Sequence, residues 1–187
     1  MLVGAEFACA LRLDGSAWCW GANRFEQLGY TTKGDASDVP ALTRAHVQRL
    51  ALGLEHACAL IGEPERTHLE CWGRNSEGQQ GGFGAGPSKA ARSKAPVDDA
   101  TFRELAAGAS HTCALTSAGA VWCWGGNGAG QAGATSGDGH VQGLPNDIVQ
   151  LAADADTTCA RSDAGDIYCW GSFGAYDYAN AGAPPAL

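Results

Sequence analysis

The sequence predicts an all-β protein built from β-propeller blades, and three observations lead to that expectation. A cysteine, a glycine-containing turn and a Cys-Trp-Gly run recur four times along the 187 residues. The first cysteines of the copies, at positions 9, 58, 113 and 159, are 49, 55 and 46 residues apart, a period typical of propellers. The short runs between the turns are rich in Val, Leu, Trp and Cys and bounded by glycine, which favours strands over helices.

Each copy has the pattern of a β-hairpin. In the first, third and fourth copies a three-residue turn with glycine in third place lies at the centre, at 13–15, 117–119 and 163–165. A three-residue hairpin loop needs a left-handed residue at that place. With such a loop Arg12 faces Ser16, and counting back along both strands brings Cys9 opposite Cys19. The cysteines then fall at non-hydrogen-bonded positions, where facing Cα atoms are about 4.5 Å apart, within the reach of a disulfide.

We therefore expect all eight cysteines to form disulfides within their own hairpins. The second copy is three residues longer, and its larger turn still allows its two cysteines to face each other. The expected pairs are Cys9–Cys19, Cys58–Cys71, Cys113–Cys123 and Cys159–Cys169. Each would close a loop of about eleven residues, worth about 2–3 kcal/mol on the chain-entropy estimate.

Both faces of each predicted hairpin are largely apolar. In the third copy Cys113 and Leu115 point to one side, whereas Ala114 and Trp124 point to the other. An isolated hairpin cannot cover two apolar faces, but a sheet stacked between two similar sheets can. Stacked blades arranged radially therefore explain the pattern.

The chain divides into four repeats of a single domain, at about 1–46, 47–100, 101–146 and 147–187. A lead-in strand precedes each hairpin except the first, so we expect the first repeat to lack its leading strand. A second signature, Gly-x-Asn-x-x-x-Gln-x-Gly, follows the hairpin at 21–29, 73–81 and 125–133 and is degenerate in the fourth repeat. We expect its Asn and Gln side chains to bond the backbone of the glycine-rich loop rather than a ligand.

With the lead-in turn, the Cys-Ala-Leu strand, the Trp-Gly strand and the Asn-x-x-x-Gln-x-Gly loop, the chain resembles the regulator of chromosome condensation repeat family. The resemblance implies four-stranded blades of a seven-bladed propeller, of which four repeats make about half. It also implies an incomplete ring, or one completed by further repeats or by self-association. The paired cysteines resemble the form of the repeat common in bacterial extracytoplasmic proteins.

Composition excludes several classes of protein. The net charge is −8 and only 17% of residues are charged, which argues against binding to nucleic acid or to an anionic membrane. No apolar run is long enough to span a membrane, and the first residues do not form a signal peptide. Eight cysteines at hairpin-partner spacing nevertheless favour an extracytoplasmic, oxidising compartment. Free thiols would favour the cytoplasm instead.

We expect no catalytic, cofactor-binding or metal-binding residues. Zinc sites need cysteines separated by two to four residues, whereas here nine, twelve, nine and nine residues intervene. His56 and His111 occupy equivalent positions, where the other copies have Phe7 and Thr157, so these positions are expected to serve packing.

The leading hypothesis is a non-enzymatic module for protein binding or surface display, with an unidentified protein partner. Three long stretches outside the expected strands, 30–45, 82–100 and 134–146, are candidate recognition loops. The alternative, by family analogy, is a regulator of a small GTPase of the guanine-nucleotide exchange type. A carbohydrate-active enzyme is a third hypothesis, and it requires a carboxylate-bearing pocket at the centre of the ring.

Overall fold

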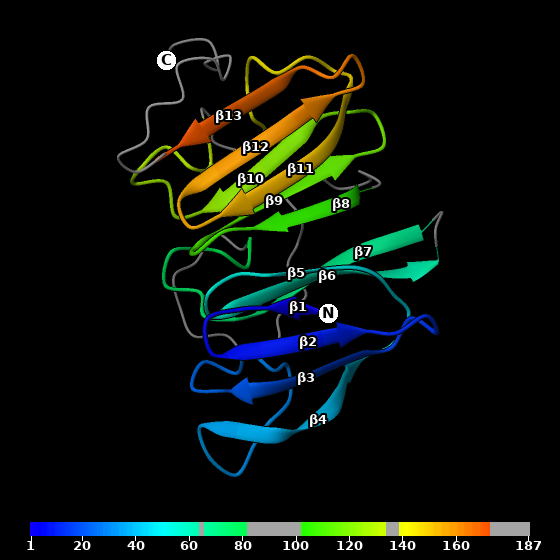
Figure 1. The fold of residues 1–187 in the computed structure, drawn as a ribbon, viewed down its shortest axis with the longest axis vertical. Coiled ribbons are helices and arrows are strands. Elements are labelled where there is room, and N and C mark those ends of the chain that lie inside the picture. The colour runs from blue at the N-terminus through cyan, green and yellow to red at the C-terminus, as the bar shows by residue number, and fades with distance from the viewer. Residues whose placement is uncertain (64–65, 82–101, 134–138, 173–187) are drawn as a thin grey trace.

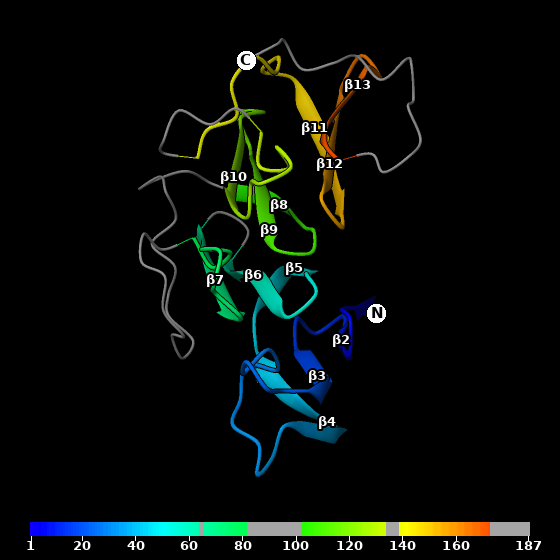
Figure 2. The same ribbon diagram turned by 90° about the vertical axis from the view of Figure 1, so that its left-hand side faces the viewer.

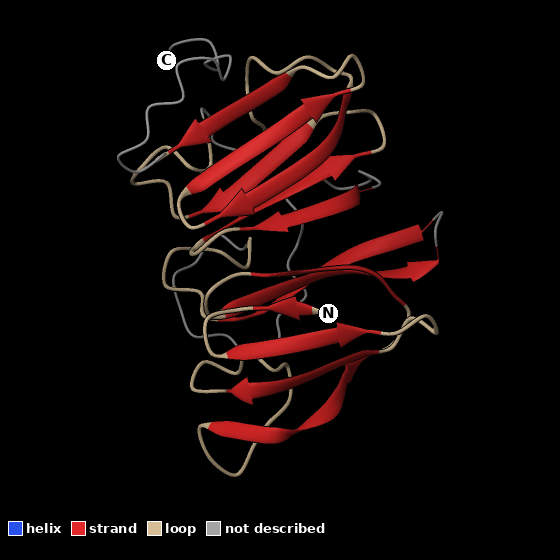
Figure 3. Ribbon diagram, viewed as in Figure 1, coloured by secondary structure: helices blue, strands red, loops and turns tan. Residues whose placement is uncertain are grey.

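The computed structural model describes residues 1–63, 66–81, 102–133 and 139–172, and this part of the chain contains strands, turns and loops but no helix (Figures 1 and 3). The strands form four antiparallel sheets, which we call blades 1 to 4 in chain order. The expected all-β, propeller-like fold is confirmed. Within the described residues no helix could cross a membrane.

Blade 1 has four strands in chain order: β1 (Leu2–Val3), β2 (Phe7–Leu11), β3 (Ala17–Ala22) and β4 (Ala36–Arg44). Blade 2 has three: β5 (Val47–Leu52), β6 (His56–Glu63) and β7 (Arg66–Gly73). Blade 3 consists of β8 (Phe102–Ala107), β9 (His111–Thr116) and β10 (Val121–Gly125). Blade 4 consists of β11 (Ile148–Asp154), β12 (Thr157–Ser162) and β13 (Ile167–Gly171). Each blade lies within one of the four expected repeats.

The central hairpins have the register that the sequence predicts. The Arg12 amide donates to the Ser16 carbonyl over 3.0 Å, and Gly15 has a φ of 77°. Gly119 and Gly165, at the same place in blades 3 and 4, have φ values of 82° and 96°. Facing residues across the hairpins include the two cysteines of every blade.

The blades stack face to face in a fan (Figures 1 and 2). We call the side of a blade that carries its disulfide the cysteine face, and the opposite side the tryptophan face. One buried cluster joins Cys9 and Cys19 of blade 1 to Ala57, Ala59 and Trp72 of blade 2. The same arrangement recurs between blades 2 and 3 and between blades 3 and 4. The cysteine face of each blade therefore packs against the tryptophan face of the next.

Backbone hydrogen bonds also connect the blades through the turn that follows the first strand of each. The amide of Ala5 donates to the carbonyl of Leu54, that of Leu54 to Ala109, and that of Ala109 to Ala155. These turns therefore run side by side along the inner side of the fan. In blade 4, the last described blade, the Ala155 amide donates to the Asp154 carboxylate of its own turn.

The structure corrects three expectations about the ends of the repeats. The first blade does have a leading strand, the two-residue β1, which pairs with β2. The stretch 30–45 is not an irregular loop, because it contains β4, the outer strand of blade 1, which pairs with β3. The sequence did not indicate this strand, because it contains Pro40 and its apolar and polar residues alternate only weakly. Proline is tolerated in such an edge strand.

In the stretch 134–146, the residues from Gly139 to Val141 bond to β10, with a bridge between Trp122 and His140, so this part also continues a sheet. The candidate loop 82–100 lies outside the described residues.

Candidate functional site

A disulfide joins the two strands of every central hairpin. The Cα atoms of each cysteine pair are 4.1 Å apart, as expected for non-hydrogen-bonded neighbours. The bonds are Cys9–Cys19, Cys58–Cys71, Cys113–Cys123 and Cys159–Cys169. No cysteine is left as a free thiol. Six of the eight are almost inaccessible to solvent, whereas Cys159 is partly exposed, so the disulfides belong to the core rather than to a reactive surface.

The repeated Asn and Gln side chains hold the loop that follows each hairpin. In blade 1 the Asn23 side-chain oxygen accepts from the Leu28 amide over 2.9 Å, and that of Gln27 accepts from the Phe25 amide over 3.0 Å. The pairs Asn75 and Gln79, and Asn127 and Gln131, make the same bonds in their own loops. The prediction that these side chains bond the backbone is confirmed.

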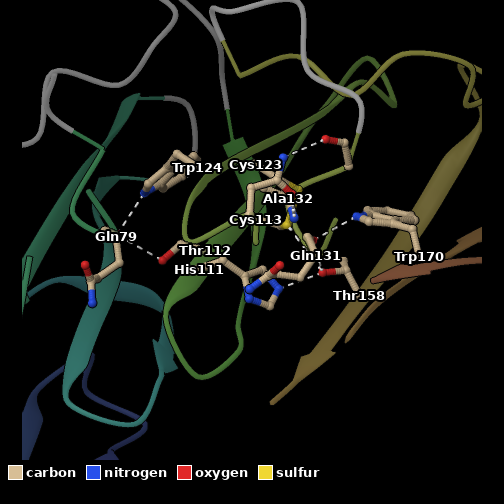
Figure 4. Close-up of a disulfide and its surroundings, with 12 residues drawn as sticks. Gln79, His111, Thr112, Cys113, Cys123, Trp124, Gln131, Ala132, Thr158 and Trp170 are labelled. Carbon is tan, nitrogen blue, oxygen red and sulfur yellow. Dashed lines mark hydrogen bonds between the residues drawn. A yellow bond between two sulfur atoms is a disulfide. The ribbon is translucent and has the colours of Figure 1, made fainter. Parts of the chain in front are cut away.

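The backbone carbonyl of the glutamine in that loop accepts hydrogen bonds from the next blade. The indole Nε1 of Trp124 donates to the Gln79 carbonyl over 2.9 Å, and the Thr112 hydroxyl donates to the same oxygen over 3.1 Å (Figure 4). Trp170 and Thr158 of blade 4 bond the Gln131 carbonyl in the same way, over 2.9 and 2.8 Å. A carbonyl oxygen has two lone pairs, so each of these oxygens is fully used in joining two blades.

A buried histidine completes the contact from the other side. His56 Nε2 lies 2.9 Å from the Thr112 hydroxyl oxygen, and His111 Nε2 lies 2.7 Å from that of Thr158. Because each threonine proton is used on a glutamine carbonyl, the hydroxyl oxygen must accept from the imidazole. Nε2 therefore carries the proton. The opposite nitrogen, Nδ1, is buried with no hydrogen-bond partner in both histidines, so both rings are neutral.

Burial sets the ionisation of these histidines. It lowers the pKa of His56 to about 3, with a smaller contribution from repulsion by His111. Burial also lowers the pKa of His111, although the nearby Asp156 carboxylate partly opposes the shift. A general base needs a pKa near the working pH and access to a substrate, and these rings have neither. They pack and bond the blades together, as the replacement by Phe7 in the first repeat suggests.

The interface between blades 1 and 2 uses different groups at the same places. Phe7 stands at the histidine position, and the facing residue of blade 2, at the threonine position, is Ala57. The Trp72 indole still donates to the Gln27 carbonyl over 2.9 Å. Arg44 adds a clamp from β4, because its guanidinium lies 4.7 Å from the centre of the Trp72 ring.

The same guanidinium forms an ion pair with Glu70 over 2.9 Å. Burial raises the pKa of Glu70, but hydrogen bonds from Arg44 and His68 outweigh it and hold that pKa below its ordinary value. The Glu70 carboxylate is therefore charged at neutral pH. Arg44 thus contacts both this carboxylate and the Trp72 ring.

Two depressions lie at opposite ends of the blades. The first, of about 250 Å³, is lined by the inner turns of all four blades, including Val3, Leu54, Ala109 and Asp154. The second, of about 470 Å³, is lined by the blade 1 hairpin turn and its surroundings, including Arg12, Asp14, His46 and Glu63. Neither brings together a set of metal ligands, and none of the described residues forms a cluster of three or more His, Cys, Asp or Glu side chains that could hold a metal ion.

The other three histidines lie apart from one another. His68 bonds Glu70, and the His140 ring packs at a tilt against Trp122 with ring centres 5.0 Å apart. His46 lies at the opposite end of the blades from the inner turns. The pairing of each histidine with a threonine of the following repeat was not anticipated. The sequence does carry a signal for it, since His56 and His111 are each followed one repeat later by a threonine, whereas Phe7 is followed by an alanine.

Comparison with known proteins agrees with this architecture. Residues 3–27 and 102–131 match the family model described as the regulator of chromosome condensation (RCC1) repeat. The RCC1 domain-containing protein RUG3, mitochondrial, of Arabidopsis thaliana is 30% identical over 128 residues, which cover 65% of this chain and 27% of the relative. The chain thus spans about a quarter of the length of that relative.

Solved structures show the same fold. Yeast RCC1 (Prp20), crystallised with Kap60, superposes with a TM-score of 0.76 at 23% identity, over 90% of this chain and 42% of that chain. Human WBSCR16 gives a TM-score of 0.72 at 21% identity, over 90% of this chain and 48% of that chain. The described residues are therefore part of a β-propeller. The segments that match the family model lie in blades 1 and 3, and the resemblance to the regulator of chromosome condensation repeat that the sequence indicates is confirmed.

Proposed function

We propose that this chain is a non-enzymatic propeller module that binds a protein segment through the inner turns of its blades. The observation that carries the proposal is the depression lined by one turn from each of the four blades. The repeated polar side chains are used in loop and blade contacts, whereas these turns differ at single places, with Leu54 where the other repeats have alanine and Ser110 where they have an acidic residue. A constant scaffold with variable turns is the usual way to build recognition.

The chemistry of this surface suggests the kind of segment that it would bind. Leu54 is 49% exposed and lines the depression, next to the exposed Val3. Carboxylates lie in the same turns, at Glu6, Asp154 and Asp156. The whole chain carries a net charge of −8. An apolar floor with acidic neighbours favours a segment that has both apolar and basic side chains.

A peptide-display selection on the immobilised protein would test this proposal. We expect enriched peptides that combine apolar and basic residues and that bind Leu54→Glu at least about tenfold more weakly. The matched control is Leu13→Glu, because Leu13 is fully exposed at the opposite end of blade 1. Lack of enrichment, or equal binding to Leu54→Glu, would refute the proposal.

The second candidate is regulation of a small GTPase, as the family resemblance implies. The yeast relative Prp20 has binding properties to Gsp1p and histones, and protein binding by that propeller supports the general class. Release of a fluorescent guanine nucleotide from a panel of small GTPases, measured with and without this protein, distinguishes the two candidates. If the protein accelerates nucleotide release and Leu54→Glu abolishes the acceleration, the result would favour regulation of a small GTPase over binding of a protein segment alone.

We also propose that the protein works in an oxidising compartment. The support is the set of four disulfides, most of which are buried among residues of the blade interfaces. Trapping thiols with an alkylating agent in intact cells, followed by mass spectrometry, is the test. Eight alkylated cysteines would place the protein in a reducing compartment.

A further inference from the structure

The asparagine that holds the loop of blade 3 differs from its two counterparts in its surroundings. Asn23 and Asn75 are 6% and 5% exposed, whereas Asn127 is exposed to solvent. The residue after Asn127 is Gly128, and this is the single Asn-Gly pair in the 187 residues. One of three otherwise equivalent loops therefore presents an Asn-Gly pair to water.

The backbone does not require glycine at this position. The φ of Gly128 lies outside the left-handed region, and a Cβ atom placed on it would have no atom within 4 Å apart from its chain neighbours. At the same place blade 1 has Arg24 and blade 2 has Ser76. What the glycine does provide is a backbone nitrogen that no side chain of its own residue covers.

This uncovered nitrogen lies next to an asparagine side chain that it can attack. The Gly128 amide donates no hydrogen bond within the described part of the chain, so its proton is available to solvent base. The Asn127 Oδ1 accepts from the Ala132 amide over 2.8 Å, and such a donor stabilises the negative charge that this oxygen takes up during the attack. The Asn127 Nδ2, which would leave, is held only by a long bond of 3.3 Å to the Gly133 carbonyl.

We propose that Asn127 is a site of spontaneous deamidation, at which the side chain is converted to aspartate and isoaspartate. Hydroxide removes the amide proton of Gly128 while the amide nitrogen forms a bond to Cγ of Asn127. The bond between Cγ and Nδ2 breaks, and ammonia leaves after taking a proton from water, so that a five-membered succinimide ring remains. Water then opens the ring at either carbonyl carbon, which gives aspartate or isoaspartate.

Asn127 positions the peptide group that joins blades 3 and 4. The Ala132 amide that it bonds and the Gln131 carbonyl belong to the same peptide group. That carbonyl accepts from Trp170 and Thr158 of blade 4 (Figure 4). Isoaspartate inserts one more carbon, about 1.5 Å, into the main chain, and aspartate replaces the Nδ2 donor by an acceptor. Deamidation is therefore expected to loosen the contact between blades 3 and 4, whatever the inner turns bind.

The test compares the folded unaltered protein with folded Gly128→Ala during incubation in a warm, mildly alkaline buffer. Peptide mapping by mass spectrometry measures deamidation at each asparagine, and an isoaspartyl methyltransferase with a labelled methyl donor measures isoaspartate. We expect Asn127 to deamidate first in the unaltered protein. The added methyl group hinders the attack and should slow the reaction at Asn127 by about tenfold, which corresponds to about 1.4 kcal/mol of activation free energy.

Far-UV circular dichroism and disulfide mapping would show that Gly128→Ala is folded, as the open space around this residue leads us to expect. Asn146 is an internal control, because it is exposed but is followed by Asp147. Equal rates at Asn127 in the two proteins overturn the proposal. Earlier deamidation at Asn75 or Asn146 in the unaltered protein overturns it as well.

Hydrogen exchange measures the consequence for the blade contact. After incubation, segments of the unaltered protein around Thr158 and Trp170 should exchange faster than in fresh protein, and segments of blades 1 and 2 should not. Gly128→Ala incubated for the same time should keep the exchange rates of fresh protein. Deamidated protein with unchanged exchange around Thr158 would overturn the inferred role of Asn127 in the contact.

Discussion

The interface between blades 1 and 2 differs in chemistry from the two interfaces that follow it, although the blades pack in the same way in all three. In each, a glutamine carbonyl of one blade receives the indole of the next. The first interface then adds Phe7 against Ala57 and a surface clamp by Arg44. The later interfaces add a buried histidine and a threonine. The comparison shows that a repeat tolerates either an apolar or a polar pair here, provided that both partners change together.

The largest expected effect is a dependence of the unfolding free energy on pH, which arises from the two interfaces that contain a buried histidine. His56 has a folded pKa of about 3 and that of His111 is also below 6.5. The unfolded chain therefore binds more protons than the folded one below about pH 6.5. Stability is complete above that pH and falls as the pH decreases toward the folded values, by up to about 1.4 kcal/mol per pH unit for each histidine. Urea unfolding at a series of pH values measures the slope.

The control for this prediction replaces both polar pairs by the apolar pair of the first interface. The variant His56→Phe, Thr112→Ala, His111→Phe, Thr158→Ala should lose the decline that begins near pH 6.5. A decline that starts only below about pH 4.5 should remain, because Glu70 has a lowered folded pKa and its contribution is lost as it becomes protonated. A slope near pH 6 that persists in this variant would contradict the assignment to the histidines.

The next largest effect comes from breaking one polar pair. Thr158→Ala leaves the buried Nε2 proton of His111 without an acceptor, which should cost about 1–3 kcal/mol of unfolding free energy. Adding His111→Phe should restore most of the loss, because the pair then resembles Phe7 and Ala57. A double-mutant cycle by urea unfolding gives the coupling energy. Simple addition of the two single costs would mean that the ring and the hydroxyl act independently.

A smaller difference should appear between equivalent tryptophans. Trp72→Phe leaves the Gln27 carbonyl without its indole donor, and nothing corresponds to the threonine of the later interfaces, so a cost of about 1–3 kcal/mol is expected. Trp124→Phe leaves the Gln79 carbonyl bonded to Thr112, so the cost should be about 0.5–1.5 kcal/mol. Thermal or urea unfolding of the two variants side by side makes the comparison. Equal losses would show that the second donor is unimportant.

The smallest expected effect is on the rate at which the disulfides are reduced rather than on the free energy of unfolding. Cys159 is partly exposed, whereas the cysteines of blades 1 to 3 are buried. Limited reduction of dilute protein, followed by alkylation and mass mapping, should therefore open Cys159–Cys169 first. Earlier reduction of any disulfide in blades 1 to 3 would contradict this order.

The predicted register of the hairpins is correct throughout, because it depends on residues that are close together in the chain. The turn at 13–15 ends in a glycine that adopts a positive φ, and counting from it aligns Cys9 with Cys19. The roles of Asn23 and Gln27 are also local, since they bond amides two to five residues away. In contrast β4, with its proline and exposed side chains, is held by β3 rather than by its own pattern.

What the sequence by itself determined is therefore the repeat, the hairpin register, the cysteine pairs and the loop contacts, all of which depend on residues close together in the chain. Only the tertiary structure decided which face of each blade meets the next. It also decided that one carbonyl takes an indole and a hydroxyl, and that the histidines are neutral. His56 and Thr112 are 56 residues apart, and His111 and Thr158 are 47 apart. The physical reason is that burial between two stacked sheets, not local sequence, removes the water that would otherwise satisfy and charge these groups.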